Sequence, residues 1–419
     1  MNSEVSILGV LVAMAVTILL IFRRINPTYA MMAGAFTGGM VGGIEVAATL
    51  DYMLEGAQLL TPAVLRILAA GILVGVLIES GAANVIANTI VEKMGETRAL
   101  LAITVSTLVL TAVGVFIAAA VITVAPIALM IAKRTEVSRL SILLAVVCGA
   151  RAGNLMSPNP NTIAASESFS IPLTEVMFAG LGPAAVGAIF TYFIAKKVND
   201  KGSKVKEIKE ERAVEENQPT FLAAISGPIF AIGILSLQPL LDIKVDSLLA
   251  LPAGGLFGVM VMRKTKKMKS YMSSGLEKMS GISILILGTG TLAGIIVNSS
   301  LNQIIMSGLN TFQLPISLIA PLSGSFMSLA TASATSSVAI SSNVFGEVLL
   351  ENGVSALAGA MMINAGAVAF DFLPHGPLFH ISRDSFYMDM KERIKALPYE
   401  ALIGILLVLV STIIYGGLF

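Results

Sequence analysis

Long runs of apolar side chains recur along the whole chain, and they restrict the fold more than any other feature of the sequence. Most of these runs are about 17–25 residues long, enough for a helix to cross a hydrocarbon core of roughly 30 Å. Only 13% of the 419 residues are charged, too few to cover the surface of a water-soluble protein of this length. We therefore predict an all-α, multi-pass membrane protein.

One stretch is too charged to lie in a membrane. It runs from Lys196 to Glu216, and most of its side chains carry a charge, so we expect a solvated linker there. The linker divides the chain into three predicted parts. These are a first membrane repeat (residues 1–197), a cytoplasmic linker (198–218) and a second membrane repeat (219–419).

The two halves resemble each other weakly. ILVGVLIES (Ile72–Ser80) matches TLAGIIVNS (Thr291–Ser299), and the order of the apolar runs repeats, as is usual for internal repeats of transporters. We predict membrane spans near residues 5–22, 28–47, 61–79, 99–117, 119–132, 139–165, 173–195, 219–239, 246–262, 280–298, 313–330, 335–350, 354–380 and 398–418.

The distribution of basic residues predicts an orientation, because cytoplasmic loops of membrane proteins are rich in Lys and Arg. All basic clusters can share the cytoplasmic side if each half crosses the membrane an odd number of times. The second repeat is then inverted relative to the first, and both termini face outward. The basic clusters are Arg23-Arg24, Lys133–Arg139, residues 196–212, Arg263–Lys269 and Arg383–Lys395. The outward loops contain Asp51, Glu55, Glu167, Asp242, Asp246 and Glu351.

A polar cluster with two prolines interrupts the apolar run that ends the first half. It reads CGARAGNLMSPNPNTIAAS (Cys148–Ser166). Non-helical backbone at membrane depth is tolerated only inside protein or beside a water-filled cavity, so the cluster predicts a broken helix that builds a substrate or ion site. A turn that ends a span is the alternative. The candidate site residues here are Arg151, Asn154, Ser157, Asn159, Asn161 and Thr162.

A second break, FDFLPHGPLFHIS, lies at the corresponding place in the other half. Paired breaks of this kind indicate a transport site. This stretch contains Asp371 and both histidines of the chain, His375 and His380. We take Asp371 and His375 as candidate proton carriers, with His375 also in the substrate site. Glu79, at the end of a span, is a further candidate carrier or an interfacial anchor.

A third polar stretch, Ser328–Gly346, is crowded with hydroxyl groups. Hydroxyls in a membrane segment can ligate Na⁺, bind a polyol, or join neighbouring helices. We include four of these residues in the predicted substrate site: Ser333, Thr335, Ser336 and Ser337. Arg151 has two interpretations, as a bidentate partner for a substrate carboxylate or as a structural partner for an acid.

Other functional classes lack a sequence signature. The chain has two histidines and one cysteine, too few for a transition-metal cluster, and it contains no P-loop, GxSxG or HExxH motif. We expect no cofactor, no metal and no nucleic-acid partner. An intramembrane enzyme and a channel stay as remote alternatives to a carrier.

Several stretches resemble the gluconate permease family, proton symporters for sugar acids within the ion-transporter superfamily. The matching stretches are GVLIESGAANVIANTIVEKMGETRA (Gly75–Ala99), VFIAAAVITVAPIALMIAKR (Val115–Arg134), SPNPNTIAA (Ser157–Ala165), SATSSVA (Ser333–Ala339) and HISRDSFYM (His380–Met388). The resemblance covers about residues 65–390 and is most specific in Gly75–Ala99 and Ser333–Ala339.

The chain departs from the family pattern at three places. An aspartate usual in the span after the ESG element is replaced by Ala118, the first break reads SPNPNT instead of PPHPGP, and SHVNDSGFW is HISRDSF. The family resemblance implies two inverted repeats with helical hairpins, a homodimer, and elevator-type alternating access.

We therefore predict a secondary active transporter of the inner membrane. It would carry a small organic anion, a sugar acid or another carboxylate, together with H⁺. A Na⁺-coupled carboxylate transporter of the same fold is the main alternative.

Overall fold

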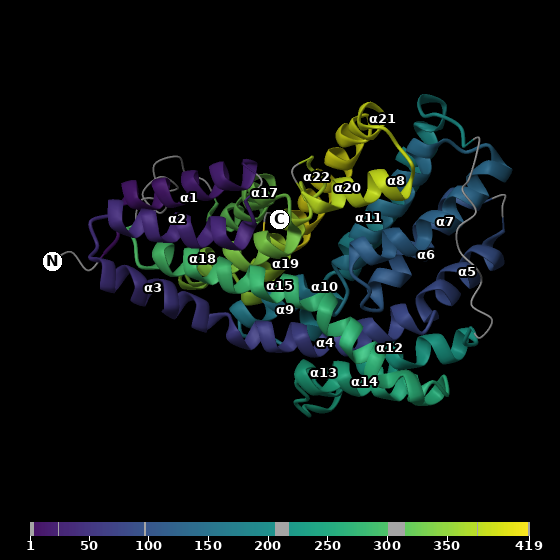
Figure 1. Ribbon diagram of the computed structural model, residues 1–419, viewed down its shortest axis with the longest axis horizontal. Coiled ribbons are helices and arrows are strands. Elements are labelled where there is room, and N and C mark those ends of the chain that lie inside the picture. The colour runs from purple at the N-terminus through teal and green to yellow at the C-terminus, as the bar shows by residue number, and fades with distance from the viewer. Residues whose placement is uncertain are drawn as a thin grey trace.

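The computed structural model describes residues 4–23, 25–95, 98–205, 218–300, 315–374 and 376–417 (Figure 1). These residues form helices joined by turns, with no β-strand among them, which confirms the all-α prediction. Within the described ranges, five helical segments are long and apolar enough to cross a membrane. They are Thr61–Glu79, Ile117–Thr135, Leu173–Lys197, Thr265–Val297 and Met390–Tyr415.

The longest helix, α15, packs along the consecutive helices α3 and α4. Gly56 lies against Gly290, and Gly71 lies against Gly275. The residue numbers rise on one side while they fall on the other, so α15 is antiparallel to α3 and α4. Glycines let the backbones approach closely, as is usual between membrane helices. The bounds are α3 (Val46–Leu59), α4 (Thr61–Glu79) and α15 (Met268–Val297).

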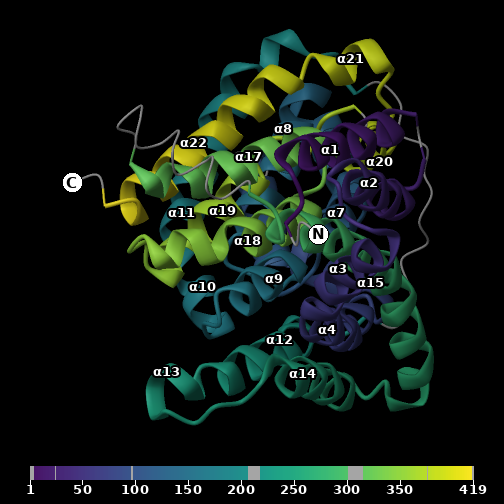
Figure 2. The same ribbon diagram turned by 90° about the vertical axis from the view of Figure 1, so that its left-hand side faces the viewer.

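Two helix pairs flank this central group. The pair α1 and α2 packs on α15, and the pair α12 and α14 packs on α4. Figure 2 shows α12, α13 and α14 as a layer below α4. The bounds are α1 (Ile7–Phe22), α2 (Pro27–Val41), α12 (Phe221–Leu235), α13 (Leu237–Leu241) and α14 (Ser247–Val261).

Each half of the chain also contributes a unit of three consecutive helices. In the first unit α6 and α8 run parallel, since Gly149 lies against Thr104 and Gly153 against Leu108. In the second unit α17 and α19 are parallel in the same way, since Gly324 lies against Ile363 and the Ser328 hydroxyl donates to the Ala367 carbonyl. The bounds are α6 (Ala99–Ala112), α7 (Ile117–Thr135), α8 (Arg139–Asn154), α17 (Ile319–Thr331), α18 (Ala334–Glu351) and α19 (Ala356–Ala367).

A short helix follows each unit and packs on the middle helix of the other one. Helix α9 (Pro160–Ser168) contacts α18, and α20 (Pro377–Ser385) contacts α7. This reciprocal packing ties the two halves together around the breaks between the helices. The outer helices are α5 (Ala82–Met94), α10 (Leu173–Ala179), α11 (Leu181–Lys197), α21 (Met390–Ile394) and α22 (Leu397–Tyr415).

Both predicted helix breaks are confirmed. The span predicted over 139–165 is divided into α8 and α9, and the one over 354–380 into α19 and α20. Other expectations are wrong. Asp51 and Glu55 lie within helix α3, and Glu167 lies in the last turn of α9, instead of in loops. Helix α15 begins at Met268, well before the predicted residue 280. The helix α5 also lies in a region that we left without a span.

Three of the basic segments that we placed on one side of the membrane lie together, those at 133–139, 196–212 and 383–395. The backbone N–H of Arg139 donates to Ser203 at 2.9 Å, and the Ser203 backbone N–H donates to Glu392 at 3.3 Å. Arg66 likewise joins two of the acidic positions, Glu167 and Asp246. Most of the linker, residues 206–217, lies outside the described residues. The orientation in the membrane stays a prediction.

The glycine contact between α4 and α15 gives a test of the packing. A methyl group at residue 275 would lie 1.9 Å from the Gly71 carbonyl oxygen, whereas one at Gly281 of the same helix would meet no atom within 4 Å. We expect Gly275→Ala to destabilise the protein by about 1–3 kcal/mol, because the backbones must separate. Gly281→Ala serves as the control and should leave stability unchanged or slightly raised. Thermal unfolding in detergent measures both; equal melting temperatures would contradict the close approach.

Candidate functional site

The break between α8 and α9 is closed by its own side chains. The Asn159 side-chain oxygen accepts hydrogen bonds from the backbone N–H groups of Asn161 (2.7 Å) and Thr162 (3.3 Å). The Thr162 hydroxyl in turn accepts from the Asn159 N–H at 3.1 Å and donates to the Ser157 carbonyl. The Asn159 amide also donates to the carbonyl of Asn154. Backbone groups that the break releases therefore find partners, as a buried break requires.

Two side chains at this break, those of Ser157 and Asn161, take no part in capping it. The Ser157 hydroxyl is fully buried and has no hydrogen-bond partner among the described residues. The Asn161 side-chain oxygen accepts a hydrogen bond from the Thr335 hydroxyl at 2.6 Å. Since Asn161 and Thr335 each lie in the first turn of a helix, this contact brings the N-terminus of α9 to the N-terminus of α18.

The break before α18 is held by hydroxyl groups. Ala332 has a left-handed conformation with φ of 47°, which ends α17. The Ser333 hydroxyl then accepts hydrogen bonds from the Ser336 backbone N–H (3.4 Å) and hydroxyl (3.1 Å). The hydroxyls of Thr331 and Ser337 are 3.3 Å apart. Most of the predicted hydroxyl residues thus form this cap, and Thr335 alone among them bonds to α9.

The break between α19 and α20 reaches the same segment. A methyl group added at Gly376 would lie 2.5 Å from the Ala332 carbonyl oxygen, so the two backbones are in contact. His380 bonds to the Pro374 carbonyl through Nε2 at 2.9 Å. Both polar breaks therefore contact residues 332–335. His375, our candidate for substrate binding and coupling, lies outside the described residues.

A fourth break completes the arrangement. The turn between α6 and α7 contains Gly114, whose φ of 108° is accessible mainly to glycine. A methyl group at Gly114 would lie 3.8 Å from Pro158. In the first half, the turn between α6 and α7 therefore lies against the break between α8 and α9. In the second half, the turn between α17 and α18 lies against the break between α19 and α20. These four helix interruptions lie in one region.

Arg151 and Asp371 connect the two breaks through a buried ion pair. The Arg151 Nε lies 3.1 Å from an Asp371 carboxylate oxygen, and the two side chains are 0% and 4% exposed. The guanidinium also donates to the Glu400 carbonyl at 3.2 Å and lies 5.1 Å from the centre of the Phe372 ring. Arg151 therefore has a carboxylate partner within the protein, and two residues predicted for different roles form one unit.

A second buried ion pair was not predicted from the sequence. Arg393 of α21 donates two hydrogen bonds to the Glu400 carboxylate at 2.7 and 3.0 Å, and a third to the Ser382 hydroxyl at 3.0 Å. Both charged side chains are fully buried. Since the Glu400 carbonyl also accepts from Arg151, the two pairs form a continuous network across α8, α20, α21 and α22. The acid Glu400 near the start of a mainly apolar helix is the sequence feature that could have indicated this buried pair.

Arg66 forms a third group of charges. Its guanidinium makes two hydrogen bonds to Asp246 (2.9 and 2.6 Å) and one to Glu167 (2.6 Å), so it joins α4 to α9 and to the first residue before α14. Glu79, the remaining candidate carrier, is bound instead to Ser274 (2.7 Å) and Lys278 (2.8 Å) of α15. Its hydrogen bonds connect it to the central helix group and not to either polar break.

Comparison with known proteins decides the family. Residues 5–252 and 245–416 match the model of the GntP family permeases. The chain belongs to the GntP permease family. A Haemophilus influenzae protein described as an uncharacterized transporter is 54% identical to this permease over 99% of both chains. The high-affinity gluconate transporter of Escherichia coli K12 is 25% identical over 160 residues, 38% of this chain and 36% of that one.

The fold of the permease also occurs in a solved structure. The crystal structure of the Alcanivorax borkumensis YdaH transporter matches with a TM-score of 0.68 over 88% of both chains, at 14% sequence identity. The family and the apolar helices together make this permease a multi-pass membrane transporter.

The ion pair between Arg151 and Asp371 predicts the outcome of a double-mutant cycle. Arg151→Gln or Asp371→Asn alone leaves one buried charge without its partner, and should destabilise the protein by about 3–5 kcal/mol. The double variant removes both charges, so it should be more stable than either single variant. Melting temperatures and purified yields in detergent measure this. Destabilisation that simply adds up in the double variant would show that the pair is not coupled.

Proposed function

We propose that this permease is a secondary active transporter that carries a small organic anion, such as gluconate or another carboxylate, together with H⁺ by alternating access. One observation carries the proposal, the meeting of the α9 and α18 N-termini at the Asn161–Thr335 contact. Helix N-termini favour anions through the helix dipole. Two of them that meet, with polar side chains between them, form a suitable site for a carboxylate.

Apart from Arg151 and His375, which are considered with coupling below, the predicted binding residues divide into two groups in this proposal. Ser157, Asn161 and Thr335 would contact the substrate, because the Ser157 hydroxyl lacks a partner within the described ranges and the other two side chains lie where the helices meet. Hydroxyl and amide groups suit a substrate with several hydroxyls. The remaining residues would hold the breaks in shape through the caps described above. They are Asn154, Asn159, Thr162, Ser333, Ser336 and Ser337.

The ion pair between Arg151 and Asp371 supports a coupling mechanism. A proton on Asp371 would neutralise the carboxylate that Arg151 contacts, and the negative charge of the substrate anion, bound where α9 and α18 meet, would replace that of the carboxylate. The charge around Arg151 then stays balanced while one proton and one anion enter together. The other nearby acid, Glu400, is already held by two hydrogen bonds from Arg393, which leaves Asp371 as the carboxylate free to change partner.

Two alternatives for coupling have specific support. His375 lies in the second break of the sequence, and histidine is the side chain whose unperturbed pKa lies closest to neutral pH, so it is the second candidate for the proton carrier. A Na⁺ ion is the other alternative, because the hydroxyl-rich cap at Ser333–Ser337 offers the oxygen ligands that Na⁺ requires.

We further infer an elevator-type carrier with two inverted repeats, acting as a homodimer in the inner membrane. The reciprocal packing of α9 on α18 and of α20 on α7 supports the repeats. The glycine-mediated packing of α4 on α15 suits a fixed scaffold, against which the units carrying the breaks would move.

Uptake into proteoliposomes tests the transport proposal. Labelled gluconate and other sugar acids, mono- and dicarboxylates should be screened under an inward proton gradient or an inward sodium gradient. We expect uptake of an organic anion that rises with the proton gradient. Asp371→Asn should abolish the dependence on pH, whereas His375→Asn should retain it. Strict sodium dependence would overturn proton coupling, and pH dependence that survives Asp371→Asn but is lost in His375→Asn would make His375 the carrier.

The Arg66 ion pairs test which parts move. If α9 moves past α4, the contact between Arg66 and Glu167 must open in each cycle, whereas the contact with Asp246 need not. We expect the variant Arg66→Cys with Glu167→Cys to take up substrate before crosslinking. A short bismaleimide that joins the two cysteines should then block its uptake. The matched control, Arg66→Cys with Asp246→Cys, should keep its uptake after crosslinking. The native Cys148 is buried and does not compete for the reagent. Equal uptake by both crosslinked proteins would contradict movement of α9 against α4.

A further inference from the structure

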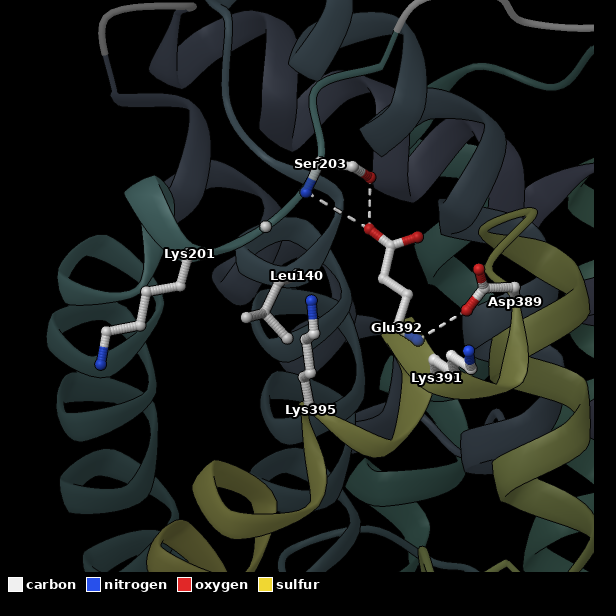
Figure 3. A pocket seen from close by; sticks show the side chains of 8 residues that line it. Leu140, Lys201, Ser203, Asp389, Lys391, Glu392 and Lys395 are labelled. Carbon is white, nitrogen blue, oxygen red and sulfur yellow. Dashed lines mark hydrogen bonds between the residues drawn. The ribbon is translucent and has the colours of Figure 1, made fainter.

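A cavity of about 320 Å³ lies between the start of α8, residues 201–203 and helix α21. Three lysines line it, Lys201, Lys391 and Lys395, together with Leu140 and two acids (Figure 3). Figure 3 shows the Lys395 side chain extending between Leu140 and Glu392.

The two acids of this pocket already have partners. The Glu392 carboxylate accepts hydrogen bonds from both the backbone N–H and the hydroxyl of Ser203. The Asp389 carboxylate accepts the Glu392 backbone N–H at 2.7 Å, which caps the start of α21. Lys201 donates to the Tyr399 hydroxyl at 3.1 Å. Lys391 and Lys395, by contrast, are exposed and form no side-chain ion pair or hydrogen bond within the described residues.

Helix α21 presents three different sides, of which two are suited to a membrane surface. Arg393 points inward to Glu400, Lys391 and Lys395 line the pocket, and Met390 and Ile394 are exposed to 43% and 46%. Lysines beside exposed apolar residues are typical of helices that lie at the level of the lipid headgroups.

Exposed apolar side chains continue from the pocket along two packed helices. Helix α22 follows α21 and exposes Leu402, Ile405 and Leu409, while α11 packs beside it and exposes Ile189 and Phe193. The contact between Lys201 and Tyr399 places the end of α11 next to the start of α22. A pocket lined by three lysines and two acids therefore lies at the end of two packed helices that expose apolar side chains and belong to segments long and apolar enough to cross a membrane.

We propose that this pocket binds the phosphate group of an anionic phospholipid, with the acyl chains against the exposed residues of α11 and α22. Basic pockets at the ends of membrane helices recognise lipid phosphates in this way. Lys391 and Lys395 would bind the phosphate, and the apolar surface would distinguish the lipid from a soluble phosphate.

Native mass spectrometry of the purified protein tests this proposal with phosphatidylglycerol, and with phosphatidylcholine as the neutral lipid. We expect phosphatidylglycerol to be retained preferentially. Lys391→Ala with Lys395→Ala should weaken its binding by about 30-fold, since each lysine near an anionic lipid contributes about fivefold. The control, Lys266→Ala with Lys267→Ala, removes the same charge from another exposed turn and should change binding little. The variant Lys391→Arg with Lys395→Arg keeps both positive charges and should bind the lipid as the unchanged protein does.

Three results would overturn the proposal. They are equal retention of the two lipids, equal effects of the two alanine pairs, and displacement of the lipid by soluble glycerol phosphate at matched concentration. The last result would indicate a site for a soluble phosphate. The measurement involves no transport, so its outcome is independent of the substrate and of the coupling ion.

Discussion

Buried backbone that is not helical must find hydrogen-bond partners within the protein, and this requirement organises the permease. Four helix interruptions lie in one region, and side chains of the interrupted segments cap at least two of them. Asn159 and Thr162 close the first polar break, and Ser333 caps the helix that faces it. Because these groups satisfy the backbone, the remaining polar side chains are available for a ligand. The structure and the proposed chemistry therefore depend on the same few residues.

The buried charges follow a similar rule. Arg151 and Asp371 face one another, and Arg393 and Glu400 face one another, so no net charge is buried in the network. The two pairs differ in geometry. Glu400 is held by two well-formed hydrogen bonds, whereas Asp371 lies at ion-pair distance from Arg151 without one from it. A tightly held pair suits a structural role, and a looser pair suits a group whose partner changes during transport.

The sequence predicted the breaks because their signals are local. Closely spaced prolines, Pro158 with Pro160 and Pro374 with Pro377, disfavour a continuous helix, and their positions match in the two halves of the sequence. Helices α3 and α5 were missed because they are less apolar than a membrane span. The early start of α15 was missed for the same reason, since its first residues, MKSYMSSGLEKMSG, include charged and polar side chains.

Ion pairs between residues that are distant in the chain could not be predicted from the sequence either. Nothing near Arg151 in the sequence identifies Asp371 as its partner, and Arg66 meets Glu167 and Asp246 only after the chain folds. The sequence indicated that each of these charges was unusual in an apolar segment. It could not show whether its partner was a substrate or another side chain, and for Arg151 the structure provides a side chain.

The central claim is that the N-termini of α9 and α18 form the anion site. A cryo-electron microscopy structure with the organic anion identified by uptake, at saturating concentration and low pH, tests it most directly. We expect density for the carboxylate within hydrogen-bond distance of Asn161 and Thr335, and we expect the Ser157 hydroxyl to contact the ligand. Ligand density away from residues 157–162 and 333–337, with the Asn161–Thr335 contact unchanged, would contradict it.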